Sequence, residues 1–267
     1  MCQSRHRSWC WSASKAEVDL PGERSANVIA SRYLPWFCVA IITVALVGCG
    51  SAEPTRPAPA PLRPSPPAPQ PPATRPSGDA PSRLRAAEAA LDQGNLVLAE
   101  REFRDALALD PKSAKAQFGL GNVYVRMNRL ADAEVAYKAA LALDAGLASA
   151  HSNLGVVYYQ MGQLARAAAE FQTALSIEPD DPQTLYLMAV VRLQENNLTA
   201  AEELLVKARD RKPDLPEVYF GLGTLYKLKG QKAEAIAAFE QFLALGPAQD
   251  PAAADYARRE LQALKGN

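Results

Sequence analysis

A regular period that carries position 94 onto 128, 162, 196 and 230 constrains this chain of 267 residues more than any other feature. The clearest unit is 148–181, where apolar residues recur three and four positions apart on both sides of Gly162. This spacing predicts two amphipathic helices with the glycine in the turn between them. Because one such pair cannot bury its apolar faces alone, we expect neighbouring copies to stack against it.

Four kinds of position recur at this period without an insertion. The turn position holds glycine or asparagine, which tolerate the left-handed backbone of a tight helix end. It is followed by a small alanine, then by a bulky residue, and in four copies by a proline that stops the second helix. The residues are Gly94, Asn128, Gly162, Asn196 and Gly230; Ala99, Ala133, Ala167, Ala201 and Ala235; Phe103, Tyr137, Phe171, Leu205 and Phe239; and Pro111, Pro179, Pro213 and Pro247. They predict five repeats, 80–113, 114–147, 148–181, 182–215 and 216–249.

These positions resemble the tetratricopeptide repeat (TPR) pattern. Leu154-Gly155-x-x-Tyr158, Ala167-x-x-x-Phe171 and Pro179 match it in the third repeat, and Leu120-Gly121-x-x-Tyr124 and Leu222-Gly223-x-x-Tyr226 match its first helix elsewhere. The first and fourth repeats depart from it, with Ala86, Ala87 and Ala90, and with Met188, Ala189 and Arg192. The resemblance implies an all-α fold, a right-handed α-solenoid of five TPR helix pairs.

Residues 250–267 predict a last helix that caps the solenoid. Asp250 is a suitable N-cap, and Pro251 suits the first helical position. Tyr256, Leu261 and Leu264 can then face the preceding repeat while charged residues face outward. A terminal helix with a polar outer face prevents further stacking.

The segment 33–48 is apolar apart from one threonine, and Arg32 precedes it. It is shorter than the roughly 20 residues that span a bilayer, so it suits the core of a secretory signal. It ends in Leu46-Val47-Gly48-Cys49, which resembles the lipobox of bacterial lipoproteins. The resemblance implies that residues 1–48 are a signal region, that Cys49 is lipidated, and that Gly50 directs sorting to the outer membrane. The alternative is a short uncleaved signal anchor.

Residues 1–27 fit neither a signal nor an anchor, and we hypothesise that translation begins nearer Val28. Residues 49–79 contain the lipidated cysteine and a proline-rich linker; 12 of the 21 prolines lie between Pro54 and Pro81. Such a composition predicts a disordered segment that prefers polyproline II and holds the repeats off the membrane. A Pro-x-x-Pro ligand, such as the one from Pro61 to Pro64, is the alternative.

The repeats offer little for catalysis or for nucleic acid. From Ala80 onward there are 21 Lys plus Arg against 24 Asp plus Glu, a difference of −3 without a basic stripe, which argues against nucleic acid as a partner. His151 lies at a helix-packing position, and no Cys-x-x-Cys, phosphate-loop or zinc-helix motif occurs. We therefore expect no enzyme activity, no cofactor and no metal.

In TPR arrays the first helix of each pair lines a concave groove that holds a partner. Carried onto this chain, that rule implies a groove of Lys115, Phe118, Asn122, Arg126, Asn153, Tyr159, Gln183, Tyr186, Phe220 and Lys227. The mixture is aromatic and amide-rich. Phe118, Gln183 and Leu187 stand where chaperone-binding TPR domains have the cations of a carboxylate clamp, which disfavours a cytosolic co-chaperone.

Lipobox and repeats together resemble the assembly lipoproteins of pili and secretins. The resemblance implies a non-catalytic protein–protein interaction scaffold, anchored by lipid in the bacterial envelope, expected at the outer membrane and facing the periplasm. Its expected partner is a peptide or helical segment of another envelope protein. The alternatives are an adaptor that recruits cell-wall hydrolases and a TPR subunit of a polysaccharide export or glycosyl-transfer machine. The oligomeric state stays open.

Overall fold

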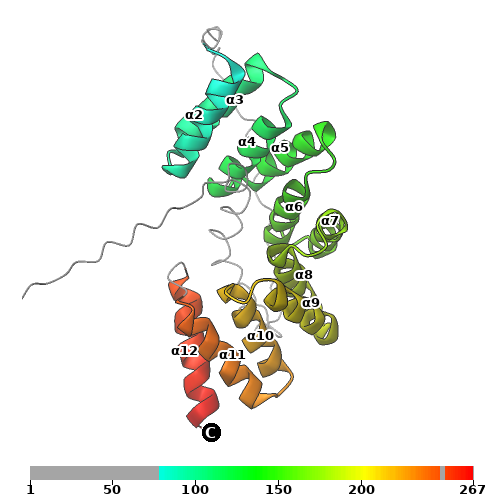
Figure 1. The fold of residues 1–267 in the computed structure, drawn as a ribbon, viewed down its shortest axis with the longest axis vertical. Coiled ribbons are helices and arrows are strands. Elements are labelled where there is room, and N and C mark those ends of the chain that lie inside the picture. Colours follow the sequence, from blue (N-terminus) through cyan, green and yellow to red (C-terminus); the bar gives the residue numbers. More distant parts are fainter. Residues whose placement is uncertain (1–77, 247–249, 267) are drawn as a thin grey trace, which may run out of the picture.

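A computed structural model describes residues 78–246 and 250–266, and in this part of the chain every regular element is an α-helix (Figure 1). The signal region, Cys49 and most of the linker lie outside the described residues. The helices are α2 (Ala80–Asp92), α3 (Leu96–Leu109), α4 (Ala114–Arg126), α5 (Leu130–Leu143), α6 (Ala148–Gln160), α7 (Leu164–Ile177), α8 (Pro182–Gln194), α9 (Leu198–Arg211), α10 (Pro216–Leu228), α11 (Lys232–Ala244) and α12 (Pro251–Gly266).

The helices are arranged as five consecutive pairs followed by α12, which confirms the predicted all-α fold. The first helices of the pairs (α2, α4, α6, α8 and α10, called A helices below) start at the evenly spaced positions 80, 114, 148, 182 and 216. Their partners α3, α5, α7, α9 and α11 are the B helices. Figure 1 shows the pairs following one another along an arc from α2 to α12, with α7 and α9 on its outer side.

The turn inside each pair has the left-handed backbone that the sequence predicts. The φ angles are +77° at Gly94, +58° at Asn128, +74° at Gly162, +56° at Asn196 and +71° at Gly230. The backbone closes around each of them in the same way; in the third repeat the N–H of Gln163 donates to the carbonyl of Tyr158 at 2.8 Å. The five turns therefore share one backbone geometry.

The contact inside each pair depends on one small and one bulky position. The five alanines at 99, 133, 167, 201 and 235 have no exposed surface, and the five bulky residues at 103, 137, 171, 205 and 239 are at most 1% exposed. A Cβ atom added to Gly155 would lie 2.6 Å from the ring of Phe171, and one added to Gly121 would lie 2.4 Å from the ring of Tyr137. Glycine is therefore required where the ring packs onto the backbone of the A helix.

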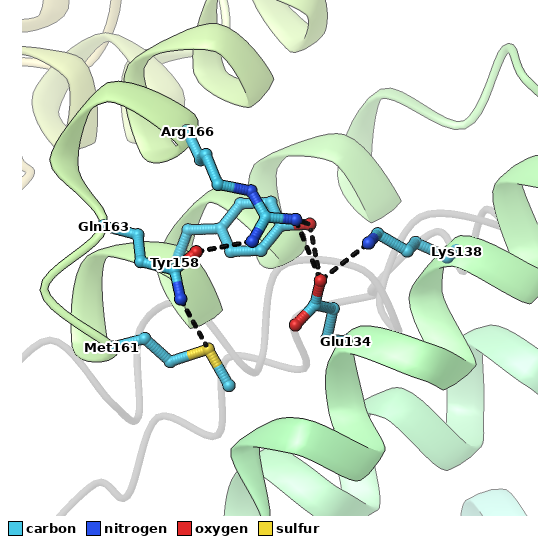
Figure 2. A network of polar contacts seen from close by, with 6 residues as sticks. All are labelled: Glu134, Lys138, Tyr158, Met161, Gln163 and Arg166. Atoms are coloured by element: carbon cyan, nitrogen blue, oxygen red, sulfur yellow. Dashed lines mark hydrogen bonds and ion pairs between the residues drawn. The ribbon is translucent and has the colours of Figure 1, made fainter.

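A polar cluster on three helices, called the Glu134 cluster below, joins the second repeat to the third (Figure 2). Tyr158 of α6 donates a hydrogen bond to the Glu134 carboxylate of α5 at 2.9 Å, and Lys138 binds the same carboxylate at 2.6 Å. Arg166 of α7 donates to it at 2.9 Å, with its guanidinium 3.8 Å from the centre of the Tyr158 ring. The hydrogen bond from Lys138, with those from Tyr158 and Arg166, lowers the pKa of Glu134 below its ordinary value.

A similar cluster occurs one repeat earlier but does not recur one repeat later. Glu100 of α3 binds Arg129 at 3.1 Å, and the Arg129 guanidinium lies 4.5 Å from the centre of the Tyr124 ring. At the joint between the third and fourth repeats the places of Glu134 and Tyr158 are held by Ala168 and Arg192. The joints between successive repeats therefore differ in the polar side chains that they contain.

Helix α12 closes the array as predicted. The Asp250 carboxylate accepts a hydrogen bond from the N–H of Ala253 at 2.8 Å and so caps the helix. The Tyr256 ring lies 5.7 Å from the ring of Phe220, which also contacts the rings of Phe239 and Phe242. This aromatic cluster buries the stacking face of the fifth repeat.

Candidate partner-binding groove

Two asparagines form a hydrogen-bonded pair across the A helices of the second and third repeats. Asn153 of α6 donates from Nδ2 to Oδ1 of Asn122 of α4 at 3.1 Å, and the Tyr137 hydroxyl donates to the same oxygen at 2.7 Å. Both asparagines are buried, each with 4% of its surface exposed. Among the described residues, Nδ2 of Asn122 and Oδ1 of Asn153 take part in no hydrogen bond, and neither atom is fully buried. The pair thus retains one unpartnered donor beside one unpartnered acceptor, the complement of a peptide group.

Two more polar pairs continue along α6 and α8. The hydroxyl groups of Thr184 and Ser152 lie 3.0 Å apart, and Gln194 donates from Nε2 to the Tyr159 hydroxyl. Ser152, Thr184 and Tyr159 are all buried. The A helices of repeats two to four are therefore joined by hydrogen bonds between neutral side chains.

The three cations of the predicted groove are committed to neighbouring helices. Lys115 lies 2.7 Å from the Glu88 carboxylate of α2, and Lys227 lies 2.7 Å from the Glu260 carboxylate of α12. Arg126 donates to the carbonyl of Leu91, where α2 ends, and so satisfies the negative end of that helix. Glu88 and Glu260 therefore offset the charges of Lys115 and Lys227, and the Arg126 guanidinium is engaged by a carbonyl, so none of the three cations is without a partner in the protein.

The aromatic residues of the predicted set differ in accessibility. Tyr186 is 1% exposed, and its ring lies against the backbone of α10, since a Cβ added to Gly221 would come within 3.3 Å of it. Phe220 is 2% exposed within the aromatic cluster under α12. Phe118 is only half-buried, with its ring 5.8 Å from the Tyr137 ring. Tyr186 and Phe220 therefore pack between neighbouring elements, and Phe118 retains an accessible surface.

Gln183 and Glu217 hold the same place in the fourth and fifth repeats, in the first turn of α8 and of α10. Nε2 of Gln183 and Oε2 of Glu217 are buried without a hydrogen-bond partner. Burial raises the pKa of the Glu217 carboxyl. A buried donor without an acceptor costs roughly 1–3 kcal/mol, so a ligand carbonyl that reached Gln183 would relieve that cost.

Comparisons with known families identify the repeats. The family described as TPR repeat matches residues 121–162, and the tetratricopeptide repeat families match 148–181 and 186–250. Over residues 121–181 and 186–250, the helix pairs of this chain match TPR repeats. The comparison with curated proteins found no match to the sequence.

Solved structures share this TPR fold. A structure of the MamA protein matches with a TM-score of 0.54 and 22% identity, over 62% of this chain and 91% of that one. YrrB, described as a TPR protein with an unusual peptide-binding site, matches with a TM-score of 0.53 and 22% identity, over 68% and 92%. PilF of Pseudomonas aeruginosa matches with a TM-score of 0.59 and 21% identity, over 69% and 88%. At such identities the likeness shows the fold alone.

The sequence prediction missed the acidic residues that neutralise the groove. Glu88 and Glu260 bind Lys115 and Lys227 from adjacent elements, and Lys227 also donates a hydrogen bond to the Tyr256 hydroxyl at 3.2 Å. Comparing facing positions in neighbouring TPR repeats could have found Glu88, because it lies one A helix away from Lys115. Glu260 belongs to α12, which lies outside the repeats, so it has no equivalent position in another repeat with which to be compared.

His151 is half-buried, and its Nδ1 lies 2.7 Å from the Glu170 carboxylate inside the third TPR repeat. Residues 78–246 and 250–266 contain no group of three or more His, Cys, Asp or Glu placed to hold a metal. Within the same ranges no helix has both the length and the apolar character to cross a bilayer.

Proposed function

We propose that this TPR protein is a non-catalytic scaffold that binds a peptide segment of a partner protein along the A helices of repeats two to four. The observation that carries the proposal is the Asn122–Asn153 pair, which leaves one donor and one acceptor of the A helices unpartnered and not fully buried. An extended peptide has both groups at nearly every residue, so the pair can hold a partner through its backbone. Phe118 supplies an accessible ring for a side chain of the partner.

The proposal includes a place in the cell. The apolar segment 33–48 followed by Cys49, with the lipobox-like Leu46-Val47-Gly48-Cys49 at its end, favours a lipid anchor in the outer membrane, facing the periplasm. The protein would then assist the assembly of a pilus, a secretin or a secretion machine. This choice of pathway is supported by the combination of a lipobox-like segment with a TPR array, and PilF of Pseudomonas aeruginosa shares the fold of that array.

Site-specific photo-crosslinking tests the groove. Lys115 is exposed on α4, so a photo-reactive amino acid placed there should capture a partner protein in intact cells. The same amino acid at Gln172, an exposed residue of helix α7, is the control. Partner capture from position 172 and not from position 115 would contradict the groove assignment.

The amide pair is tested in the same assay. Asn122→Ala with Asn153→Ala should reduce the crosslinked product from position 115 by up to about thirtyfold, since a charge-free hydrogen bond contributes about 1 kcal/mol and two are lost. Gln172→Ala removes an amide from the B helix and should leave the product unchanged. Circular dichroism of each variant checks that the array remains folded.

The anchor is tested by mass spectrometry of the protein extracted from membranes. The expected N-terminal residue is an acylated Cys49, and Cys49→Ser should release the protein into the soluble fraction or leave it unprocessed. A mature protein that begins at any other residue would contradict the anchor and would leave the groove proposal standing.

A further inference from the structure

The groove on α4, α6 and α8 combines two properties that specify a ligand. Its cations already have partners, because Lys115 is paired with the Glu88 carboxylate and Arg126 donates to the Leu91 carbonyl, both of α2. It also has two hydrogen-bond donors without acceptors, Nδ2 of Asn122 and the buried Nε2 of Gln183, against one acceptor without a donor, Oδ1 of Asn153. A suitable ligand therefore needs no charge and carries more carbonyl groups than N–H groups.

A segment of this chain has this chemistry. Residues 64–74 read Pro-Ser-Pro-Pro-Ala-Pro-Gln-Pro-Pro-Ala-Thr, without a charged residue and with six prolines. Proline has no N–H, so such a segment offers backbone carbonyls with few competing donors. Proline-rich segments also prefer the extended polyproline II form, which loses little entropy on binding and packs against aromatic rings such as that of Phe118.

The repeat array begins where this segment can reach the groove. Asp79 caps α2 at its first turn, and because the A helices repeat one orientation, this end lies at the same edge as Lys115 and Gln183. The segment 75–79 spans about 15 Å when extended at roughly 3.1 Å per residue. Neighbouring helices lie about 8–10 Å apart, so residue 74 can reach α4. The segment 64–74 extends over about 34 Å, enough to cross α4, α6 and α8.

We propose that residues 64–74 bind the groove over α4, α6 and α8 while no partner is present, and that a partner must displace them. This inference rests on the groove of the proposed function but not on the identity of the partner. A short tether holds the segment at an effective concentration in the millimolar range, so even a weak contact is well populated. The linker is then both the tether of the array and a competitor for its ligands.

A peptide competition experiment tests the tethered contact. The probe is a fluorescein-labelled peptide of residues 64–74, and its anisotropy is measured with the full-length chain in detergent. The comparison is a chain of equal length in which the six prolines of 64–74 are replaced by serine. For a peptide Kd near 0.1 mM, we expect about tenfold tighter binding to the serine-linker chain, because the native chain carries its own competitor. Equal affinity for both chains, or no binding to either, would overturn the proposal.

Two further measurements locate and assign the contact. In the serine-linker chain, Gln183→Ala should weaken peptide binding several-fold, and Gln172→Ala should not; equal binding by both variants would remove the site from α8. Dilution of the native chain should leave its apparent affinity for the peptide unchanged, because the competitor is tethered. An affinity that rises on dilution would mean that the linker of a second copy fills the groove, and the intramolecular proposal would be wrong.

This experiment is independent of the partner. If the peptide fails to bind while photo-crosslinking from position 115 still captures a partner, only the linker contact is wrong. If the peptide binds as expected and no partner is captured, the groove is real and the scaffold proposal fails.

Discussion

In the third repeat Gly155 faces the ring of Phe171, whereas the fourth repeat has Ala189 and Leu205 at the same two places. Phe171, Ala189 and Leu205 have no exposed surface, and the turns after both A helices are left-handed. Relative to the third repeat, the A helix of the fourth gains a methyl group at Ala189, and its B helix loses the volume of an aromatic ring at Leu205. The pair therefore keeps its spacing because the two changes compensate in volume.

The same two repeats differ in how they use polar groups. The third repeat has Tyr158 in the Glu134 cluster and His151 paired with Glu170 at 2.7 Å. In the fourth repeat the places of His151 and Glu170 are held by Leu185 and Leu204, and Leu185 is 2% exposed. Burial of a leucine contributes about 1.5–3 kcal/mol, which is comparable to a small set of partly exposed hydrogen bonds. The TPR fold therefore requires matched side-chain volumes inside each helix pair and a left-handed turn between the helices. The remaining contacts can be either polar or apolar.

The volume argument gives the largest predicted effect. Gly155→Ala should destabilise the array by about 1–3 kcal/mol, because the added methyl group would lie 2.6 Å from the buried Phe171 ring and this outweighs the gain in helix propensity. Adding Phe171→Leu recreates the pair of the fourth repeat and should recover most of the loss. Chemical denaturation of the four proteins in a double-mutant cycle measures this coupling. If the losses of stability from Gly155→Ala and Phe171→Leu were simply additive, the volumes at these two positions would not compensate each other as the comparison implies.

The turn argument gives the next effect. Gly162→Ala should cost about 1–2 kcal/mol, because a left-handed φ of +74° is strained for a residue with a Cβ. Asn196→Gly in the fourth repeat relaxes the same strain and should be neutral or slightly stabilising. Midpoints of urea denaturation report both changes. An equal loss from both substitutions would show that the side chain of Asn196 is itself required.

The Glu134 cluster gives a pH-dependent effect. The pKa of Glu134 is lowered in the folded protein, so the unfolded chain takes up a proton first as the pH falls. The stabilisation from the cluster is then present above the ordinary pKa of about 4.5 and is lost as the pH falls through the lowered folded value. Glu134→Gln should reduce stability at pH 7 by about 1 kcal/mol and have a smaller effect at pH 3. A loss of the same size at both pH values would contradict a role for the charged carboxylate.

The smallest predicted effect comes from transferring the cluster. Ala168→Glu with Arg192→Tyr places a carboxylate and a phenol at the joint between the third and fourth repeats, as at Glu134 and Tyr158. The pair should stabilise that joint by about 0.5–1 kcal/mol, because the hydrogen bond would be partly exposed. Ala168→Glu alone, which lacks the tyrosine, is the matched control. A pair no more stable than this control would mean that the cluster also needs the cations of Lys138 and Arg166.

The sequence by itself determined the repeat, its length and the positions that control each pair. The residues at 94, 128, 162, 196 and 230 predict left-handed turns, because only glycine and asparagine enter that backbone region readily. The alanine and bulky positions predict the buried contact, since their sizes must match across a fixed helix spacing. These are local requirements, and a single repeat period expresses them all.

Only the tertiary structure decided which of the groove residues remain accessible. The repeat positions of Lys115 and Lys227 do not indicate whether these lysines are paired. In the structure, Glu88 and Glu260 of neighbouring elements bind them. Phe220 belongs to the register of the groove and is buried by α12, which lies outside the period. Such contacts depend on how successive pairs are rotated against one another, and periodicity within a pair does not contain that angle.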